Sequence, residues 1–201
     1  MGENISIRFA GMGGQGIIFS GIVLARAFAL YERRDGREMN ATQTQSYGPE
    51  ARGGASKCDV KVSEDEGFYP LIEVPDYLVL MSKPAYDKYL ENTNPETVVV
   101  LDKGSIEDRP DLEHYVVPAT EKAEEMEARI VANVIMLGAF VSISGIVSHE
   151  SVMRALGDVA PRGTEDLNKK AYRLGMEVGN GVKEGKLSDS TESGSEPERA
   201  G

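Results

Sequence analysis

A glycine-rich segment near the start of the sequence has the residue types and the spacing of a phosphate-binding loop. Gly11, Met12, Gly13, Gly14, Gln15 and Gly16 fit the pattern G-x-G-x-x-G. An apolar run, Ile5–Ala10, precedes the segment and predicts a buried strand, and a helix is predicted from Ile17 to about Arg33. Glycines let the backbone approach a phosphate closely, and the first N–H groups of a helix have no partner within it. We therefore expect a diphosphate at residues 11–16. The alternative is a tight strand-to-helix turn that binds nothing.

NAD is one diphosphate that such a segment can bind. Its ribose needs an acidic residue at the end of the second strand, about 20 residues further on. Asp35 and Glu38 have roughly this spacing, but Asp35 lies in a predicted turn and Glu38 at the start of the predicted strand Arg37–Gln45. The two histidines, His114 and His149, have no evident acid–base partners, and surface or capping roles are expected for both. The sequence therefore does not favour a NAD dehydrogenase.

A second segment, residues 46–54, combines an arginine, an aromatic hydroxyl and adjacent glycines. Its candidate ligand-binding residues are Ser46, Tyr47, Arg52, Gly53 and Gly54. Glycine and proline within the segment predict a loop. In a doubly wound sheet, a loop that follows a strand can reach the first glycine-rich loop at the ligand crevice. Arg52 could then hold a phosphate with two hydrogen bonds, or it pairs with Glu50 or with a neighbouring subunit.

The rest of the chain predicts alternating strands and helices. Strands are expected at Ser56–Val62, Tyr77–Met81, Thr97–Leu101 and Tyr115–Val117, and helices at Pro84–Glu91 after an N-cap at Ser82, Ser148–Val159 and Thr164–Val182. This pattern indicates an α/β fold: a Rossmann-like, doubly wound, mostly parallel sheet with C-terminal helices, spanning residues 1–185. Residues 186–201 are rich in Ser, Glu, Gly and Pro, and we expect a disordered tail there.

The stretch Ile130–Val147 is apolar and long enough to cross a membrane. Polar residues interrupt it, and it has no basic flank or aromatic belt, so we expect a buried helix instead. That helix could pack in the core of the chain, or partly against a partner subunit where Gly138 and Gly145 allow close approach.

Composition restricts the function further. The formal net charge of -11 argues against nucleic acid as a partner. Cys58 is the one cysteine, so the chain alone cannot build an iron–sulfur site, and a cytoplasmic location is expected. Cys58 shares a face of its predicted strand with Val60 and Val62, which indicates a structural role.

Taken together, these segments resemble the γ subunits of 2-oxoacid:ferredoxin oxidoreductases. The resemblance rests on Phe9–Leu24, on the loop Ser46–Gly54 and on Asn133 with Leu137-Gly138-Ala139, and it covers nearly all of residues 5–180. The loop is most similar to that of the 2-oxoglutarate synthase type. The resemblance implies a pyruvate/ketoisovalerate oxidoreductase γ-type domain.

The resemblance also implies an activity that this chain does not perform alone. The complex oxidatively decarboxylates a 2-oxoacid, here 2-oxoglutarate, to acyl-CoA with ferredoxin as electron acceptor. Thiamine diphosphate, Mg²⁺ and iron–sulfur clusters are then expected in the partner α and β subunits and a ferredoxin-like δ subunit, and this chain helps to bind coenzyme A. The alternative is a purely structural subunit of a pyruvate, 2-oxoisovalerate or indolepyruvate ferredoxin oxidoreductase.

The first prediction concerns Arg52. If its guanidinium contacts a phosphate of coenzyme A, Arg52→Ala removes a charge-assisted hydrogen bond worth about 1.5–3 kcal/mol. The KM for coenzyme A should then rise by about one to two decades in the assembled complex, with the KM for the 2-oxoacid little changed. Steady-state kinetics in which each substrate is varied in turn measure both constants. Failure of the variant to assemble would place Arg52 at a subunit interface instead.

Overall fold

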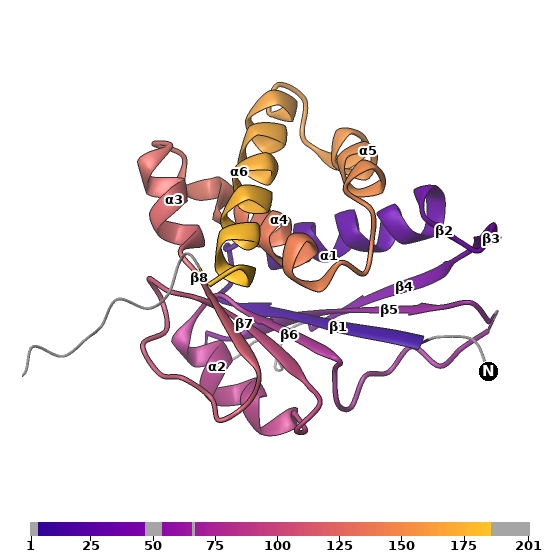
Figure 1. Ribbon diagram of the computed structural model, residues 1–201, viewed down its shortest axis with the longest axis horizontal. Coiled ribbons are helices and arrows are strands. Elements are labelled where there is room, and N and C mark those ends of the chain that lie inside the picture. Colours follow the sequence, from indigo (N-terminus) through magenta and orange to yellow (C-terminus); the bar gives the residue numbers. More distant parts are fainter. Residues whose placement is uncertain (1–3, 47–53, 66, 186–201) are drawn as a thin grey trace, which may run out of the picture.

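The computed structural model describes residues 4–46, 54–65 and 67–185. A six-stranded sheet, in the order β4-β5-β1-β6-β7-β8, runs through the middle of the molecule with helices on both faces (Figure 1). Its strands are β1 (Asn4–Gly11), β4 (Asn40–Gln45), β5 (Ser56–Ser63), β6 (Tyr77–Leu80), β7 (Val98–Asp102) and β8 (His114–Val117). The helices are α1 (Ile17–Arg26), α2 (Lys83–Tyr89), α3 (Ala119–Glu125), α4 (Ala132–Ser144), α5 (His149–Val159) and α6 (Glu165–Lys183).

The sheet is mostly parallel, as predicted. Strand β1 pairs in parallel with β6, β6 with β7, and β7 with β8. The exception is β5, which is antiparallel to both β1 and β4, so that β4 points in the same direction as β1. This antiparallel strand was not predicted. The connection from β4 to β5 is too short for the crossover that a parallel neighbour would need, which explains the direction of β5.

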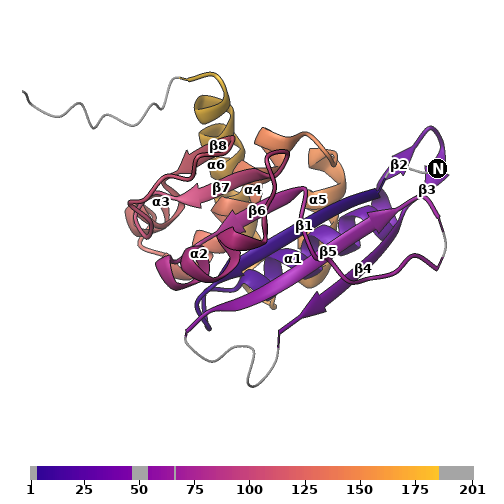
Figure 2. The ribbon, with the colours of Figure 1, turned by 90° about the horizontal axis from the view of Figure 1, so that it is seen from below.

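Most of the core lies on one face of the sheet. Helices α1, α4, α5 and α6 cover this face (Figure 1), and the buried side chains beneath them include Ile7, Phe9 and Val79. Phe9 meets Phe140 of α4 edge to face, with ring centroids 5.7 Å apart. The opposite face, seen from below in Figure 2, is covered by α2 and holds a smaller apolar cluster around Leu78 and Leu80. Because both faces are covered, β6 is a continuous apolar run, and β7 is apolar up to Asp102.

A buried ion pair joins β1 to β5. Arg8 and Asp59 face each other across the two strands, and they are only 2% and 3% exposed. Arg8 donates from Nε to Asp59 Oδ1 at 2.7 Å and from Nη2 to Asp59 Oδ2 at 2.9 Å. The same Nη2 donates to the backbone carbonyl of Ile72 at 2.7 Å. Both charges are therefore compensated, and the segment between β5 and β6 is tied onto this face of the sheet.

Helix α4 packs against α6 with almost no side chain between the two backbones. A Cβ added at Gly138 would collide with the carbonyl of Tyr172, and one at Gly179 would lie 2.6 Å from the carbonyl of Ala139. Gly145 ends α4 in the left-handed conformation, with φ of 63°. The buried core helix is thus confirmed, although it is shorter than predicted. The close neighbour of Gly138 is α6 of the same chain, so the alternative of a partner subunit was wrong at this glycine. No helix in the described part of the chain is long and apolar enough to cross a membrane.

The helix after the glycine-rich segment ends earlier than predicted. Helix α1 continues as a π-helical turn, Ala27–Tyr31, and the chain then forms a hairpin of β2 (Arg33–Arg34) and β3 (Arg37–Glu38). Asp35 and Gly36 make the turn of this hairpin with φ of 50° and 77°, as a two-residue turn of the primed type requires. The predicted turn at Asp35 is confirmed, whereas the single strand Arg37–Gln45 is divided into β3 and β4.

Cys58 lies where α1 crosses β5 most closely. Its side chain is fully buried, and a Cβ added at Gly21 of α1 would collide with Cys58 Sγ. Gln43 Nε2 donates to the same sulfur at 3.0 Å. Burial raises the pKa of the Cys58 thiol to about 11, and the contact with Gln43 opposes this shift. The thiol is therefore uncharged at neutral pH and fills space against Gly21, as expected for a structural cysteine.

A pair of substitutions tests this packing. Gly21→Ala should lower the free energy of unfolding by about 1–3 kcal/mol, because the new methyl group overfills the space beside the sulfur. Cys58→Ala removes that sulfur, so the double variant Gly21→Ala/Cys58→Ala should be more stable than the sum of the two single losses predicts. Denaturant titration of all four proteins measures the coupling. Simple additivity would mean that helix and strand do not meet through these two residues.

The raised pKa of the Cys58 thiol predicts that the stability of the chain depends on pH. An unfolded cysteine ionises near ~8.5, whereas the pKa of Cys58 in the folded chain is about 11. Its contribution to stability is therefore fully present below about pH 8.5 and is lost as the pH rises toward 11. Cys58→Ala should remove this part of the alkaline loss of stability. Native protein at neutral pH should also resist iodoacetamide, and rapid alkylation without unfolding would contradict the buried position.

Candidate functional site

The glycine-rich segment connects the end of β1 to the start of α1, as predicted. Gly16 is the N-cap residue of α1 in the left-handed conformation, with φ of 74°. The first turn of the helix contains no acidic residue. The N–H groups at the start of an α-helix lack partners within it and carry the positive end of the helix dipole. The position therefore has the electrostatics of an anion site.

Different structural constraints favour glycine at different positions of this loop. A Cβ at Gly11 would lie 2.7 Å from Gln15 Oε1, and one at Gly16 would lie 2.6 Å from Asn133 Nδ2. Gly14 has φ of 89°, which a side chain rarely tolerates. Gly13 has neither constraint, because its φ is not positive and a Cβ there would meet nothing within 4 Å. The fold alone thus accounts for three of these glycines, and Gly13 presents bare backbone to open space.

Two amide side chains hold the loop in place. Gln15 Nε2 donates to the carbonyl of Met81, at the end of β6, at 2.9 Å, and Gln15 Oε1 accepts from the N–H of Met12 at 2.6 Å. Asn133 of α4 donates from Nδ2 to the carbonyl of Gly16 at 3.0 Å. Gln15 was predicted to bind the ligand, but its polar atoms are used within the fold. Asn133 is one of the residues on which the resemblance rests, but its hydrogen bond to Gly16 could not be found from local patterns.

The second predicted loop connects β4 to β5, and β5 is the neighbour of β1. Ser46 donates its N–H to the carbonyl of Lys57 at 3.0 Å and accepts from the Lys57 N–H through Oγ at 2.9 Å. Ser56, at the start of β5, pairs with Gly11 at the end of β1. Gly54, with φ of 81°, lies next to this junction and faces open space. The structure thus places Gly54 two residues before the pair of Ser56 and Gly11 and leaves Ser46 on the far side of β5 from β1, whereas Tyr47, Arg52 and Gly53 lie outside the described residues.

A hollow of about 260 Å³ adjoins the glycine-rich loop. Gly14 and Gly16 form part of its wall. The remaining lining comes from α1, from the start of α4 and the turn before it, and from α6 and the turn before it, and it is mostly apolar: Phe19, Ile130, Val131, Pro161 and Leu167. Asn133, Thr164 and Asn168 supply its polar groups. Sequence reasoning did not identify this hollow, because its residues come from three separate stretches of the chain, 14–19, 130–133 and 161–168.

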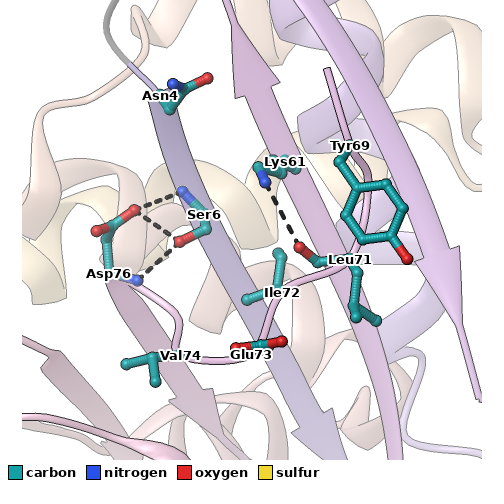
Figure 3. A pocket seen from close by; sticks show the side chains of 9 residues that line it. All are labelled: Asn4, Ser6, Lys61, Tyr69, Leu71, Ile72, Glu73, Val74 and Asp76. Atoms are coloured by element: carbon teal, nitrogen blue, oxygen red, sulfur yellow. Dashed lines mark hydrogen bonds between the residues drawn. The ribbon is translucent and has the colours of Figure 1, made fainter. Parts of the chain in front are cut away.

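A larger hollow, of about 480 Å³, lies at the opposite end of β1 (Figure 3). Here Asp76 Oδ2 accepts from the N–H and the Oγ of Ser6 at 2.7 and 2.6 Å, and Lys61 Nζ donates to the carbonyl of Leu71 at 3.4 Å. These polar groups are satisfied by one another, and the hollow contains none of the predicted ligand-binding residues. Size alone therefore does not make it the functional site.

The residues considered for NAD lie far from the glycine-rich loop. Asp35 and Glu38 belong to the β2–β3 hairpin, at the other end of the sheet from the end of β1 (Figures 1 and 2). Glu38 pairs there with Arg33 at 2.8 Å. The His149 ring stacks on Tyr172, with centroids 5.3 Å apart, and His114 Nδ1 lies 2.9 Å from the carbonyl of Leu112. Within residues 4–46, 54–65 and 67–185, no three His, Cys, Asp or Glu side chains gather as a metal site would require.

Solved structures with the same fold include subunits of oxoacid:ferredoxin oxidoreductases. The γ subunit of a keto/oxoacid ferredoxin oxidoreductase from Geobacter sulfurreducens superposes with a TM-score of 0.77 at 33% identity, covering 90% of this chain and 98% of that chain. A 2-oxoglutarate:ferredoxin oxidoreductase from Magnetococcus marinus, solved with 2-oxoglutarate, coenzyme A and succinyl-CoA bound, gives a TM-score of 0.75 over 88% of this chain and 31% of that chain. At 23% identity, this second likeness is one of fold.

The sequence comparisons agree with the structural ones. The 2-oxoglutarate synthase subunit KorC of Methanocaldococcus jannaschii is 46% identical over 177 residues, which cover 86% of this chain and 92% of that protein. The family model described as pyruvate ferredoxin/flavodoxin oxidoreductase matches residues 6–178, from the first strand of the sheet to the last helix. This chain therefore belongs to the pyruvate ferredoxin/flavodoxin oxidoreductase family.

Proposed function

We propose that this chain is the γ subunit of a 2-oxoglutarate:ferredoxin oxidoreductase and that its glycine-rich loop binds the diphosphate of coenzyme A. The complex would oxidatively decarboxylate 2-oxoglutarate and transfer the acyl group to coenzyme A. The high identity to KorC supports 2-oxoglutarate over pyruvate or 2-oxoisovalerate as the substrate class.

The bare backbone at Gly13 is the observation that carries the proposal for the loop. Packing does not require a glycine there, and no atom of the described residues lies where a side chain would be. A phosphate could therefore come within hydrogen-bond distance of the backbone. The start of α1 adds N–H donors and the dipole, without an acidic side chain to repel the anion. Coenzyme A carries a diphosphate, which fits this set of donors.

The redox chemistry would come from partner subunits. The chain has one cysteine, and that residue is buried in the core, whereas cluster ligands are cysteine thiolates. We therefore assign thiamine diphosphate, Mg²⁺ and the clusters to the α, β and ferredoxin-like δ subunits, with ferredoxin as the electron acceptor. In this arrangement the γ subunit orients the acyl acceptor and contributes to assembly.

A structural role without coenzyme A is the second candidate. The observation in its favour is Ile130, an apolar side chain that is 83% exposed beside the loop. Exposed apolar groups of this kind can mark a contact with another subunit. Under this alternative, the loop only shapes the surface on which the partner packs.

Gly13→Val separates the two candidates. The branched side chain should block close approach of the diphosphate, and the loss of one or two hydrogen bonds to a charged group weakens coenzyme A binding about 10- to 100-fold. Decarboxylation with transfer of the first electrons should be unaffected, because thiamine diphosphate and the clusters are assigned to other subunits. Single-turnover reduction without coenzyme A, followed by titration with coenzyme A, measures each half of the reaction.

Gly157→Val is the matched control. Gly157 lies on the exposed side of α5 and has ordinary φ, and a Cβ added there would also meet nothing within 4 Å, but this residue does not line the loop or its hollow. The variant should leave the affinity for coenzyme A unchanged. If a fully assembled Gly13→Val complex binds coenzyme A with normal affinity, the coenzyme A proposal is contradicted and the structural role is favoured.

A further inference from the structure

Strand β4 forms one margin of the six-stranded sheet, and within the described residues it pairs with β5 alone (Figure 2). Its six residues include no charged residue, proline or glycine, and its register on β5 runs without a bulge from Asn40 to Gln45. Proteins usually protect an edge strand by keeping it very short, by placing charges or proline on it, or by a bulge. Strand β8, at the other margin, has only four residues. Strand β4 has none of these protections, so another strand can join its edge.

The hydrogen bonds to β5 show which backbone groups of β4 face outward. The N–H of Ser46 donates to the carbonyl of Lys57 at 3.0 Å, and these two residues continue the register of the two strands. In an antiparallel ladder, residues that bond to the neighbouring strand alternate with residues that do not. The N–H and C=O groups of Ala41 and Gln43 therefore point away from β5. Among the residues that the structure describes, neither has another backbone partner.

A hollow of about 370 Å³ lies along the first half of this edge. Its lining includes Asn40, Ala41 and Thr42 of β4, with Ala29 of the π-helical turn and Phe68 from the segment after β5. Ala29 is exposed and Phe68 is half-buried, so both offer apolar surface beside the outward groups of Ala41. In strand addition, main-chain hydrogen bonds supply affinity and pockets for alternate side chains supply specificity. Both features occur together at this edge.

We propose that an extended segment of a partner subunit adds to the sheet at β4. Its backbone pairs with Ala41 and Gln43, and one of its apolar side chains enters the hollow. The proposal rests on the proposed function, which assigns other subunits to the complex. A second copy of this chain could also supply a strand, but each copy has a formal net charge of -11. A net charge far from zero keeps copies of a protein apart, which favours a strand from a different subunit.

Hydrogen exchange of single amides tests the pairing in the unmodified protein. The N–H groups of Ala41 and Gln43 should exchange rapidly in the isolated chain and at least about tenfold more slowly in the assembled complex. Those of Thr42 and Thr44, which face β5, should exchange slowly in both. Fast exchange of Ala41 and Gln43 in the complex would overturn the inference. Protection that grows with concentration in the isolated chain, with a dimer in sedimentation equilibrium, would overturn it too, because a second copy would then occupy the edge.

Ala41→Pro tests how much the edge contributes to assembly. Proline removes the outward N–H and leaves the hydrogen bonds to β5 in place, because neighbouring residues make them. The dissociation constant of this chain from its partner subunits should rise about tenfold, since one hydrogen bond is lost and the ring obstructs the added strand. Titration of the labelled chain into the remaining subunits measures this constant. If Ala41→Pro does not fold, the exchange measurement still decides.

Val116→Pro is the matched control at the opposite margin of the sheet. The N–H groups of Val99 and Lys103 donate to the carbonyls of Glu113 and Val117, so the N–H of Val116 faces away from β7. The variant therefore places a proline at an outward position of the other edge strand and should leave the dissociation constant unchanged. Equal weakening by the two variants would overturn the inference.

The activity of the same complex separates this inference from the proposed function. Slow exchange of Ala41 and Gln43 in a complex that does not oxidise 2-oxoglutarate would support the edge contact and contradict the proposed function. Fast exchange in a complex that oxidises 2-oxoglutarate would contradict the edge contact alone. A chain that forms no complex with another subunit would contradict both.

Discussion

The buried pair of Arg8 and Asp59 sets the geometry on which the site depends. Two charges that are almost fully buried are stable only when they face each other, and removing one partner from such a pair costs about 3–5 kcal/mol. A shift of β5 by one residue would separate them and would also turn Cys58 out of the core. The register of β5 on β1 is therefore strongly determined. This register places Ser56 opposite Gly11, so the start of β5 lies beside the end of β1, where the glycine-rich loop begins.

Much of the fold could be predicted because local patterns report burial. Strands β6 and β7 are covered on both faces and are continuously apolar, and Ser82 caps α2 by accepting from the N–H of Ala85, as its position suggested. The β2–β3 hairpin was missed because its strands have two residues each, too few for a period to show. The direction of β5 was missed because alternation along a strand does not say how its neighbours run.

The site was predictable in position but not in the roles of its residues. The glycine spacing located the loop, yet the hydrogen bonds of Gln15 and Asn133 join residues 66 and 117 positions apart in the sequence. Contacts over such separations leave no trace in a local pattern. A meeting of the two loops was expected from a parallel sheet, whereas in the structure β5, which follows the second loop, is antiparallel and begins at Ser56, opposite Gly11 at the end of β1. Asn168 could not be distinguished in the sequence, because its helix has an ordinary amphipathic pattern.

The direct backbone contact between α4 and α6 has a consequence for synthesis of the protein. Domains generally fold as units during synthesis, and α6 is made after the sheet and the glycine-rich loop of this domain. Because Gly138 and Gly179 bring the backbones of the two helices into direct contact, α6 packs against α4 in one position. That docking brings Asn168 to the hollow. A nascent chain thus completes the recess only after translation has passed α6, and prematurely terminated chains would lack one of its walls.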